Sequence, residues 1–487
     1  MPQTLKENVA GFVEEMLLVI ERESDFESAF RIAEKLVCYL TANSAGLYRC
    51  DHLEDTLVAK IGDGVEVGSE PPLPGIELHV ASQIYRSGGH TPLMRSLIHE
   101  GRRTAHALLT RPAAASEAAD ILGLGADQVT TLPLSGLARE HITLLVQQLL
   151  RFDEVVLHIH PDDVACAVAL RVAKRVRPEL RISFVNHADH LFSVGVGIAD
   201  HLFEVSAYGW MLREQRGSME RSSYIGIPIL AGGGMAAAPQ LSANGPYILT
   251  GGARYKFKPI GGMSLAPAME RLLAASPDMR LVVLGGTDRD WWWKPLIRRF
   301  GSRVQLINTM PKEQYRDLLQ GASLYVDSYP WIGGTAFPEA LMLGRSVAGM
   351  LGLAWGYSAA DDLRSSDEGQ FVESCLALIQ LDPAALARQQ AVRTTCLEHH
   401  DPAKVRSRMD EHLVSGHVVC PPPEQLKHPP VPRIEALWEQ TGRSNLPSKQ
   451  RVNLSRTARR KFHLAHARAM GWFNLASLKL MMYGYLP

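Results

Sequence analysis

The sequence predicts an α/β protein built from two doubly wound, Rossmann-like domains that face each other across a cleft. Short apolar segments at 76–84, 154–160 and 181–187 alternate with helix-like segments, and the same alternation restarts at 247 after a glycine- and alanine-rich connector at 231–245. Short buried strands that alternate with amphipathic helices are typical of a parallel sheet covered by helices on both faces. Two successive units of this kind place a ligand site between them.

This pattern divides the chain into four segments. Residues 1–70 have the periodicity of amphipathic helices and end in a stretch rich in glycine and proline. We assign residues 71–240 to the first Rossmann-like domain, residues 241–425 to the second, and residues 426–487 to a proline-rich connector with a basic helical tail. The tail has the spacing of a helix, which either docks on the protein or lies at an anionic membrane surface.

Composition narrows the function classes. The 487 residues contain 51 basic and 51 acidic side chains, and this balance argues against a nucleic-acid partner. No apolar run approaches the roughly 18 residues of a membrane-spanning helix. The six cysteines include no C-x-x-C pair, as expected for reduced thiols of a cytoplasmic protein. We therefore expect a cytoplasmic protein, with a possible peripheral contact at the inner face of the membrane through the basic tail.

A turn with small and basic residues follows the first strand of the second domain. It runs from Gly251 to Pro259. Glycine lets the backbone approach a ligand closely, and Arg254, Lys256 and Lys258 offer cations to a phosphate. This turn is the first half of a predicted phosphate site.

A glycine-rich turn after a later strand supplies the second half. Gly333, Gly334 and Thr335 would stand at the N-terminus of the next helix. The free N–H groups and the dipole of a helix N-terminus favour a phosphate. Glu339, one turn into that helix, could accept hydrogen bonds from a ribose. The two turns together predict a nucleotide site.

These motifs resemble those of the GT-B fold glycosyltransferases, and above all those of the O-GlcNAc transferase family. The resemblance rests on Y-K-F-K-P at 255–259, on P-K-E at 311–313, and on the stretch 327–339, and it extends over residues 245–425. The tetratricopeptide array of that family is absent, because residues 1–70 show no 34-residue repeat. A protein acceptor is therefore not implied.

The resemblance implies an enzyme of the hexosyl- or N-acetylhexosaminyltransferase type, metal-independent and inverting, with a UDP-sugar as donor and no further cofactor. It implies these roles: diphosphate stabilisation by Lys256, phosphate binding by Gly334 and Thr335, ribose binding by Glu339, and base contacts by Met310 and Lys312. Retaining enzymes of this fold commonly carry two glutamates eight positions apart around the nucleotide turn. Glu339 could be the second of them, but Trp331 stands where the first would be, and this difference favours inversion. Residues 71–240 would bind the acceptor, which could be a glycan, a lipid-linked intermediate or a protein.

Sugar transfer also needs a base for the acceptor hydroxyl. His90 follows a Gly-Gly turn after the segment 76–84, and His187 and Asp189 follow the strand that begins at 181. Because the carboxyl ends of strands face the ligand site in a doubly wound sheet, we predict these three residues as catalytic, together with Lys256. The Asp189 carboxylate could orient the His187 ring or act as the base itself.

Two other interpretations fit parts of the sequence. His158, His160, Asp162 and Asp163 could join His187, Asp189 and His190 in a metal site of a hydrolase, because H-x-H on a strand places both rings on one face. The aspartates could instead cap the next helix. A sugar-nucleotide epimerase or binding protein of the same fold would keep the nucleotide turn, but a binding protein has no use for a histidine cluster.

Overall fold

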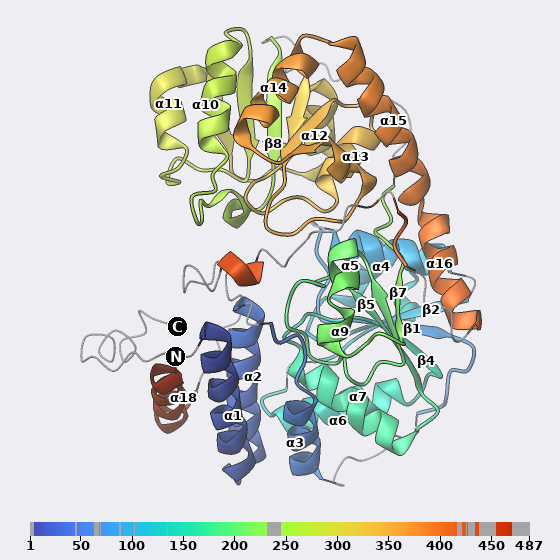
Figure 1. The fold of residues 1–487 in the computed structure, drawn as a ribbon. Coiled ribbons are helices and arrows are strands. Elements are labelled where there is room, and N and C mark those ends of the chain that lie inside the picture. Colours follow the sequence, from blue (N-terminus) through green and yellow to red (C-terminus); the bar gives the residue numbers. More distant parts are fainter. Residues whose placement is uncertain are drawn as a thin grey trace.

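The computed structural model describes residues 4–43, 46–62, 68, 70–86, 89–101, 103–133, 135–230, 245–415, 421–424, 426, 434–437 and 454–469. Within these residues the chain forms two parallel sheets with helices on both faces, one above the other in Figure 1. The predicted α/β class with two doubly wound units is confirmed. The connector predicted at 231–245 lies outside the described residues, except for Gly245.

The first sheet has seven parallel strands in the order β3-β2-β1-β4-β5-β6-β7. Its strands are β1 (Glu77–Ala81), β2 (Ala105–Leu109), β3 (Val129–Thr131), β4 (Glu154–His158), β5 (Arg181–Asn186), β6 (His201–Glu204) and β7 (Ser222–Tyr224). Its helices are α4 (His90–His99), α5 (Ala115–Leu122), α6 (Ala138–Leu149), α7 (Val164–Val176), α8 (Ala207–Met211) and α9 (Arg213–Arg216). The strand order reverses between β1 and β4, so the loops that follow these two strands border the switch point of the sheet.

The second sheet has six strands in the order β10-β9-β8-β11-β12-β13. Its strands are β8 (Tyr247–Gly251), β9 (Arg280–Leu284), β10 (Val304–Ile307), β11 (Leu324–Val326), β12 (Val347–Met350) and β13 (Arg364–Ser365). Its helices are α10 (Ala266–Ala275), α11 (Lys294–Phe300), α12 (Lys312–Gly321), α13 (Ala336–Met342) and α14 (Glu368–Ile379). Here the switch point lies between β8 and β11.

Alternate side chains of each strand enter different cores, as the pleat requires. In β4, Val155 and Leu157 pack with α6, α7 and the N-terminal helices, whereas Val156 packs against Leu93 and Leu97 of α4. Both faces of the first sheet are therefore buried. This explains why its strands read as short continuous apolar runs in the sequence.

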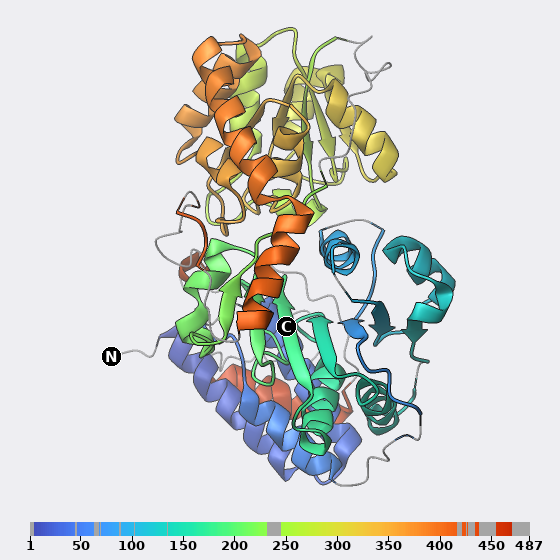
Figure 2. The same cartoon turned by 90° about the vertical axis from the view of Figure 1, so that its right-hand side faces the viewer.

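Two long helices connect the domains. The helix α15 (Pro383–His399) packs on α13 of the second domain, and α16 (Pro402–Ser415) returns to α4 and β7 of the first, as Figure 2 shows. Arg406 of α16 forms a bidentate ion pair with Glu77 of β1, at 2.7 and 2.9 Å. Both side chains are buried, so α16 is held on the first domain although it follows the second in the chain.

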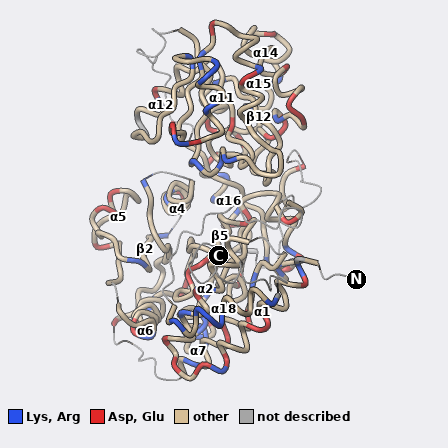
Figure 3. The backbone as a smooth tube through the Cα atoms, turned by 90° about the vertical axis from the view of Figure 1, so that its left-hand side faces the viewer, with Lys and Arg blue, Asp and Glu red and all other residues tan. Residues whose placement is uncertain are grey.

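The N-terminal helices α1 (Leu5–Arg22), α2 (Phe26–Ala42) and α3 (Asp51–Ile61) form a layer with the tail helix α18 (Arg456–Ala469) against the first domain. Phe462 of α18 is 1% exposed and meets Phe12 edge-on, with 5.2 Å between ring centroids. The apolar face of α18 is thus docked on the protein, and its lysine and arginine residues, coloured blue in Figure 3, are exposed. None of the described helices is both long and apolar enough to cross a bilayer.

Candidate functional site

The loops at the two switch points touch each other. A Cβ built on Gly89, in the loop after β1, would lie 3.0 Å from Cγ2 of Thr335, in the turn before α13. A Cβ built on Gly334 would lie 3.3 Å from the ring of Tyr357 and 3.7 Å from Cδ1 of Ile227 in the first domain. Glycine at these positions allows the two predicted turns to approach so closely. The turns therefore form one site.

The first domain contributes a pair of histidine rings to this site. His90 begins α4, and its ring centroid lies 4.2 Å from that of His187, just beyond β5. His90 Nε2 lies 2.7 Å from the carbonyl oxygen of His158. A carbonyl oxygen only accepts hydrogen bonds, so Nε2 carries the proton and Nδ1 of the neutral ring carries the lone pair. The two predicted histidines thus meet.

His187 is held as a neutral ring. Burial lowers its pKa well below the ordinary value, and the neighbouring His90 and His160 lower it further. Its Nδ1 atom is buried and has no hydrogen-bond partner among the described residues. A neutral imidazole with an unpaired nitrogen can exchange a proton with a bound substrate.

Asp189 has a different position from the one we expected. Its carboxylate is fully buried and accepts a hydrogen bond from Ser206 Oγ. Its other oxygen lies 3.5 Å from both the Tyr357 hydroxyl and Nδ1 of His190. No hydrogen bond joins it to His187 in the described structure, so the expectation that it orients that ring is not met. Asp189 instead holds the loop after β5 against the second domain.

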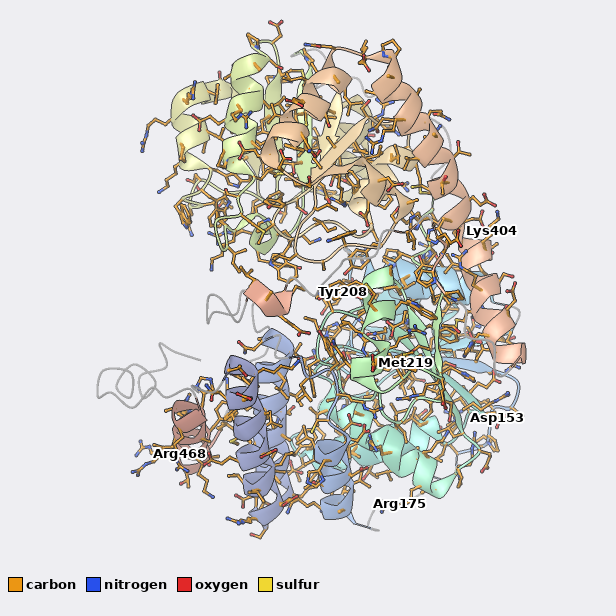
Figure 4. The ribbon with its side chains drawn as sticks, viewed as in Figure 1. Asp153, Arg175, Tyr208, Met219, Lys404 and Arg468 are labelled. Carbon is orange, nitrogen blue, oxygen red and sulfur yellow. The ribbon has the colours of Figure 1, made fainter. Side chains whose placement is uncertain are left out.

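Two aromatic residues of the second domain reach this loop, and no sequence motif pointed to their role. Tyr357, in the loop after β12, places its hydroxyl 3.4 Å from Nδ1 of His190. Trp331, in the turn after β11, lies 5.9 Å from the same ring, centroid to centroid. Both are contacts between residues far apart in the chain, which local patterns do not encode. Tyr208, labelled in Figure 4 near the boundary between the domains, belongs to the same apolar cluster as Trp331.

The second domain contributes a cation at its switch point. Lys256 lies on the 3-10 turn that follows β8, and its Nζ donates a hydrogen bond to the carbonyl oxygen of Ile332, at 3.1 Å. This bond ties the loop after β8 to the loop after β11. Burial lowers the pKa of Lys256. The charge of Asp327 counteracts this lowering, and the charge of Arg364 adds to it.

Asp327 organises the glycine-rich turn from within. It accepts a hydrogen bond from the backbone N–H of Gly333, at 2.9 Å, and pairs with Arg364, at 2.7 Å. The Gly333 N–H, which we predicted for phosphate binding, is therefore engaged inside the loop. The phosphate-binding capacity of this turn then falls to Gly334 and Thr335, and Thr335 stands at the N-cap of α13.

Arg254 is also engaged. Its guanidinium pairs with the carboxylate of Asp290, which is buried and accepts a second hydrogen bond from the N–H of Thr287, at 2.9 Å. We predicted that the Arg254 guanidinium binds a phosphate. To bind a phosphate, this side chain would have to share its guanidinium between Asp290 and the ligand or leave the pair.

The residues predicted for the nucleoside lie around the carboxyl ends of β8, β10 and β11. Met310 is half-buried and packs beside Tyr315 and the core of the second domain. Lys312 begins α12, and its side chain lies outside the described part of the structure. Glu339 is half-buried on the first turn of α13. Burial raises the pKa of Tyr315, and the nearby Glu339 charge raises it further, which places Glu339 next to this group.

The rings of His158, His160 and His187 lie around His90, with centroids 6.4, 5.9 and 4.2 Å from it, but the residues of the metal hypothesis do not form a ligand set in the described structure. His158 lies 3.0 Å from His79, whereas His160 stacks on Tyr85 with 5.7 Å between ring centroids. Asp163 caps α7 by accepting a hydrogen bond from the N–H of Cys166, at 3.1 Å. Among the described residues, no three His, Cys, Asp or Glu side chains are grouped so that they could hold a metal ion. The hydrolase interpretation therefore finds no ligand set in this part of the chain.

Neither a protein-family model nor a curated protein matches the sequence. Solved structures do. HepE of Anabaena, in complex with UDP and glucose, has a TM-score of 0.52 and 16% identity, over 69% of this chain and 99% of HepE. A mutant O-GlcNAc transferase of Thermobaculum terrenum has a TM-score of 0.51 and 15% identity, over 85% of this chain and 79% of that transferase. A glycosyltransferase of Rickettsia africae has a TM-score of 0.53 and 11% identity, over 69% of this chain and 97% of that enzyme. At such identities the likeness establishes the fold, and this chain has the GT-B fold.

Proposed function

We propose that this protein is a glycosyltransferase that transfers a sugar from a UDP-sugar to an acceptor nucleophile, without a metal ion and with inversion. One observation carries the proposal. His90, whose ring contacts that of His187, and the Lys256 and Thr335 turns of the second domain border two switch points whose loops are in contact. Ligands of open parallel sheets bind at such points.

The second domain supplies what a departing nucleotide needs. Negative charge develops on the diphosphate as the bond to the sugar breaks. The Lys256 ammonium and the backbone N–H groups of Gly334 and Thr335 would stabilise this charge in a site from which water is largely excluded. Met310, Lys312 and Glu339 would hold the base and ribose, and Arg254 would assist if it exchanged Asp290 for a phosphate.

The first domain supplies a base. As the acceptor oxygen attacks the anomeric carbon, its proton would pass to a ring nitrogen of His90 or of the neutral His187. A single displacement with one base inverts the anomeric configuration. Trp331 stands where retaining enzymes carry the first of their two glutamates, and this difference supports inversion. Asp189 would act indirectly, by fixing the loop that carries His187.

The choice of donor rests on likeness. HepE of Anabaena was solved with UDP-glucose as well as with UDP. A hexosyl or N-acetylhexosaminyl group is the corresponding proposal for this chain. The acceptor would bind on residues 71–240 and would be a glycan, a lipid-linked intermediate or a protein. The exposed basic face of α18 would favour an acceptor at an anionic membrane surface.

Calorimetric titration with UDP, GDP and ADP, each with magnesium and with EDTA, tests the nucleotide site. We expect UDP to bind most tightly and the affinity to survive EDTA. Absence of any nucleotide binding would refute the proposal. Release of UDP from a UDP-sugar that depends on added acceptor would support transfer, whereas isomerisation of the bound sugar without such dependence would support the epimerase alternative.

A further inference from the structure

A line of buried polar side chains leads from α16 to the histidine pair. Arg406 holds both carboxylate oxygens of Glu77, at 2.7 and 2.9 Å. Glu77 Oε1 lies 2.8 Å from His79 Nε2, and His79 Nδ1 lies 3.0 Å from His158 Nε2. His158 in turn accepts the hydrogen bond of His90 Nε2 on its backbone carbonyl oxygen. Four residues thus connect the interdomain helix to a proposed catalytic ring.

This line occupies a place where apolar packing would be expected. Glu77, His79 and His158 lie on the face of the first sheet that packs against α4 and α16, together with Val156. The side chains of Glu77 and Arg406 are 5% and 4% exposed, and both histidine residues are 0% exposed. Removing such charges from water is unfavourable unless pairing and hydrogen bonds offset the lost hydration. A buried ion pair is weak evidence for stability, so a role in the neighbouring site deserves a test.

The geometry fixes where the protons are. Burial alone would raise the pKa of Glu77, but hydrogen bonds from Arg406 and His79, together with the charge of the Arg406 guanidinium, lower it below the ordinary value. The ionised carboxylate only accepts, so His79 carries a proton on Nε2. In the neutral His79 ring, Nδ1 then accepts from Nε2–H of His158. This leaves His158 Nδ1 unprotonated.

The opposite arrangement is less favourable. It requires a His79 imidazolium that donates to His158 Nε2, so that His158 carries its proton on Nδ1. That atom is buried and has no hydrogen-bond partner among the described residues. An orphaned buried N–H and an additional buried charge both cost free energy. The single pattern that remains has one proton on Nε2 of each of His79, His158 and His90.

We propose that Glu77 and His79 are positioning residues of the transfer reaction, which keep the histidine cluster in one neutral, proton-accepting tautomer pattern. The proposal rests on the transferase function proposed above. His158, whose ring centroid lies 6.4 Å from that of His90, would then present no positive charge and no competing N–H to the pair. The proton that leaves the acceptor hydroxyl would therefore meet an unprotonated base.

The charged and titratable groups around His158 come from four elements. Glu77 and His79 belong to β1, His90 to α4, and His187 to the loop after β5; all four influence the His158 charge. Arg406 of α16 faces Glu77 and compensates its charge. Arg406 also pairs with Asp410 of the same helix, at 2.8 Å, so the formal charges of the set are two carboxylates and one guanidinium, and a change at Glu77 disturbs their balance directly.

Glu77→Gln tests the proton pattern. Either orientation of the new amide sets an N–H group against a guanidinium N–H, and the charge-assisted bond to His79 is lost. In the wild type we expect nitrogen-15 spectra to show His79 and His158 protonated on Nε2 alone, with His79→Gln used for assignment. In Glu77→Gln we expect a second population protonated on Nδ1. The same single pattern in both proteins would overturn the proposal.

Kinetics test the link to the reaction. We expect Glu77→Gln to lower kcat by at least about tenfold, a part of the roughly 10²–10⁴-fold that general-base catalysis contributes. The acid limb of the kcat profile should move to lower pH, while the KM for the UDP-sugar and the affinity for UDP stay unchanged. His79→Gln should give the same loss of kcat, and it serves as the second test if Glu77→Gln yields too little folded protein.

Glu54→Gln is the matched control. Glu54 is a buried carboxylate of α3 that pairs with Arg171 at 2.7 Å, in the N-terminal layer and outside the site. Its loss should lower Tm without changing kcat or the pH profile of the folded enzyme. Equal kinetic effects of Glu54→Gln and Glu77→Gln would overturn the positioning role. A wild type that neither binds UDP nor transfers a sugar would refute the proposed function, while the spectra would still decide the proton pattern.

Discussion

Replacement of Lys256 by methionine separates a catalytic role of this cation from a structural one. Methionine keeps a flexible, unbranched stem of similar length, so the packing around the stem is largely preserved. The change removes one hydrogen bond, from Nζ to the carbonyl oxygen of Ile332 at 3.1 Å. A bond of this kind contributes on the order of 1 kcal/mol to stability. Burial already disfavours the ammonium, as its lowered pKa indicates, so the net loss should be no larger.

The effect on transfer should exceed the effect on stability. Loss of one preorganised group that stabilises developing negative charge typically costs about 10²–10³ in kcat, or about 3–4 kcal/mol. The free energy of unfolding of most domains is about 5–15 kcal/mol, so a loss of about 1 kcal/mol leaves Lys256→Met folded. We therefore expect a nearly unchanged unfolding transition and a kcat lower by at least a hundredfold.

The assay is UDP release from the preferred UDP-sugar in the presence of acceptor, combined with chemical unfolding followed by circular dichroism. Lys294→Met is the control, because Lys294 is an exposed lysine of the same domain, at the start of α11. The control should retain wild-type kcat. Wild-type turnover by Lys256→Met, or an equal loss in both variants, would refute the assignment of Lys256 to the leaving diphosphate.

Two further perturbations follow from the geometry. Gly89→Ala places a Cβ 3.0 Å from Cγ2 of Thr335 and should lower kcat/KM by about tenfold, since small displacements at the reacting centre are costly. The double variant with Thr335→Ser, which removes Cγ2, should regain part of the activity. An unchanged kcat/KM in Gly89→Ala would contradict the contact between the two loops. Burial lowers the pKa of His400 and of His466 to about 4. The unfolded rings bind a proton near pH 6.5 and the folded rings only near pH 4, so stability should fall as the pH falls through this window, by up to about 3 kcal/mol per residue. Unfolding curves at pH 7 and pH 4.5 measure this loss, and equal stability at both values would show that the rings are not held neutral.

Local patterns were sufficient for much of the fold. Short apolar runs between amphipathic helices identified the longer strands of both sheets, because strands buried on both faces of a parallel sheet carry an apolar side chain at nearly every position. The strands β3, β6, β7 and β13 escaped this reasoning. They have two to four residues each, and a period is hard to recognise in so short a segment.

The candidate site was predictable wherever chemistry and local geometry coincide. The basic turn at Lys256 and the glycine turn at Thr335 each lie within a few residues of a strand end, so composition and spacing pointed to both. The partners of these residues were not predictable in this way. Pairing of Arg254 with Asp290 and of the Gly333 N–H with Asp327 depends on side-chain directions that the sequence does not display.

The class of the fold, the presence of two units and the positions of the turns follow from the amino-acid sequence, since these depend on neighbours in the chain. Which of these residues meet depends on how the folded elements pack together. Glu77 and Arg406 are 329 positions apart, and the return of α16 to the first domain brings them together. His90 and His187 belong to different strand-helix units, and the strand order of the first sheet brings their rings together. Such contacts arise from the packing of whole elements, which is cooperative and non-local. Residue type limits what a side chain can do, and packing decides with which partner it does it.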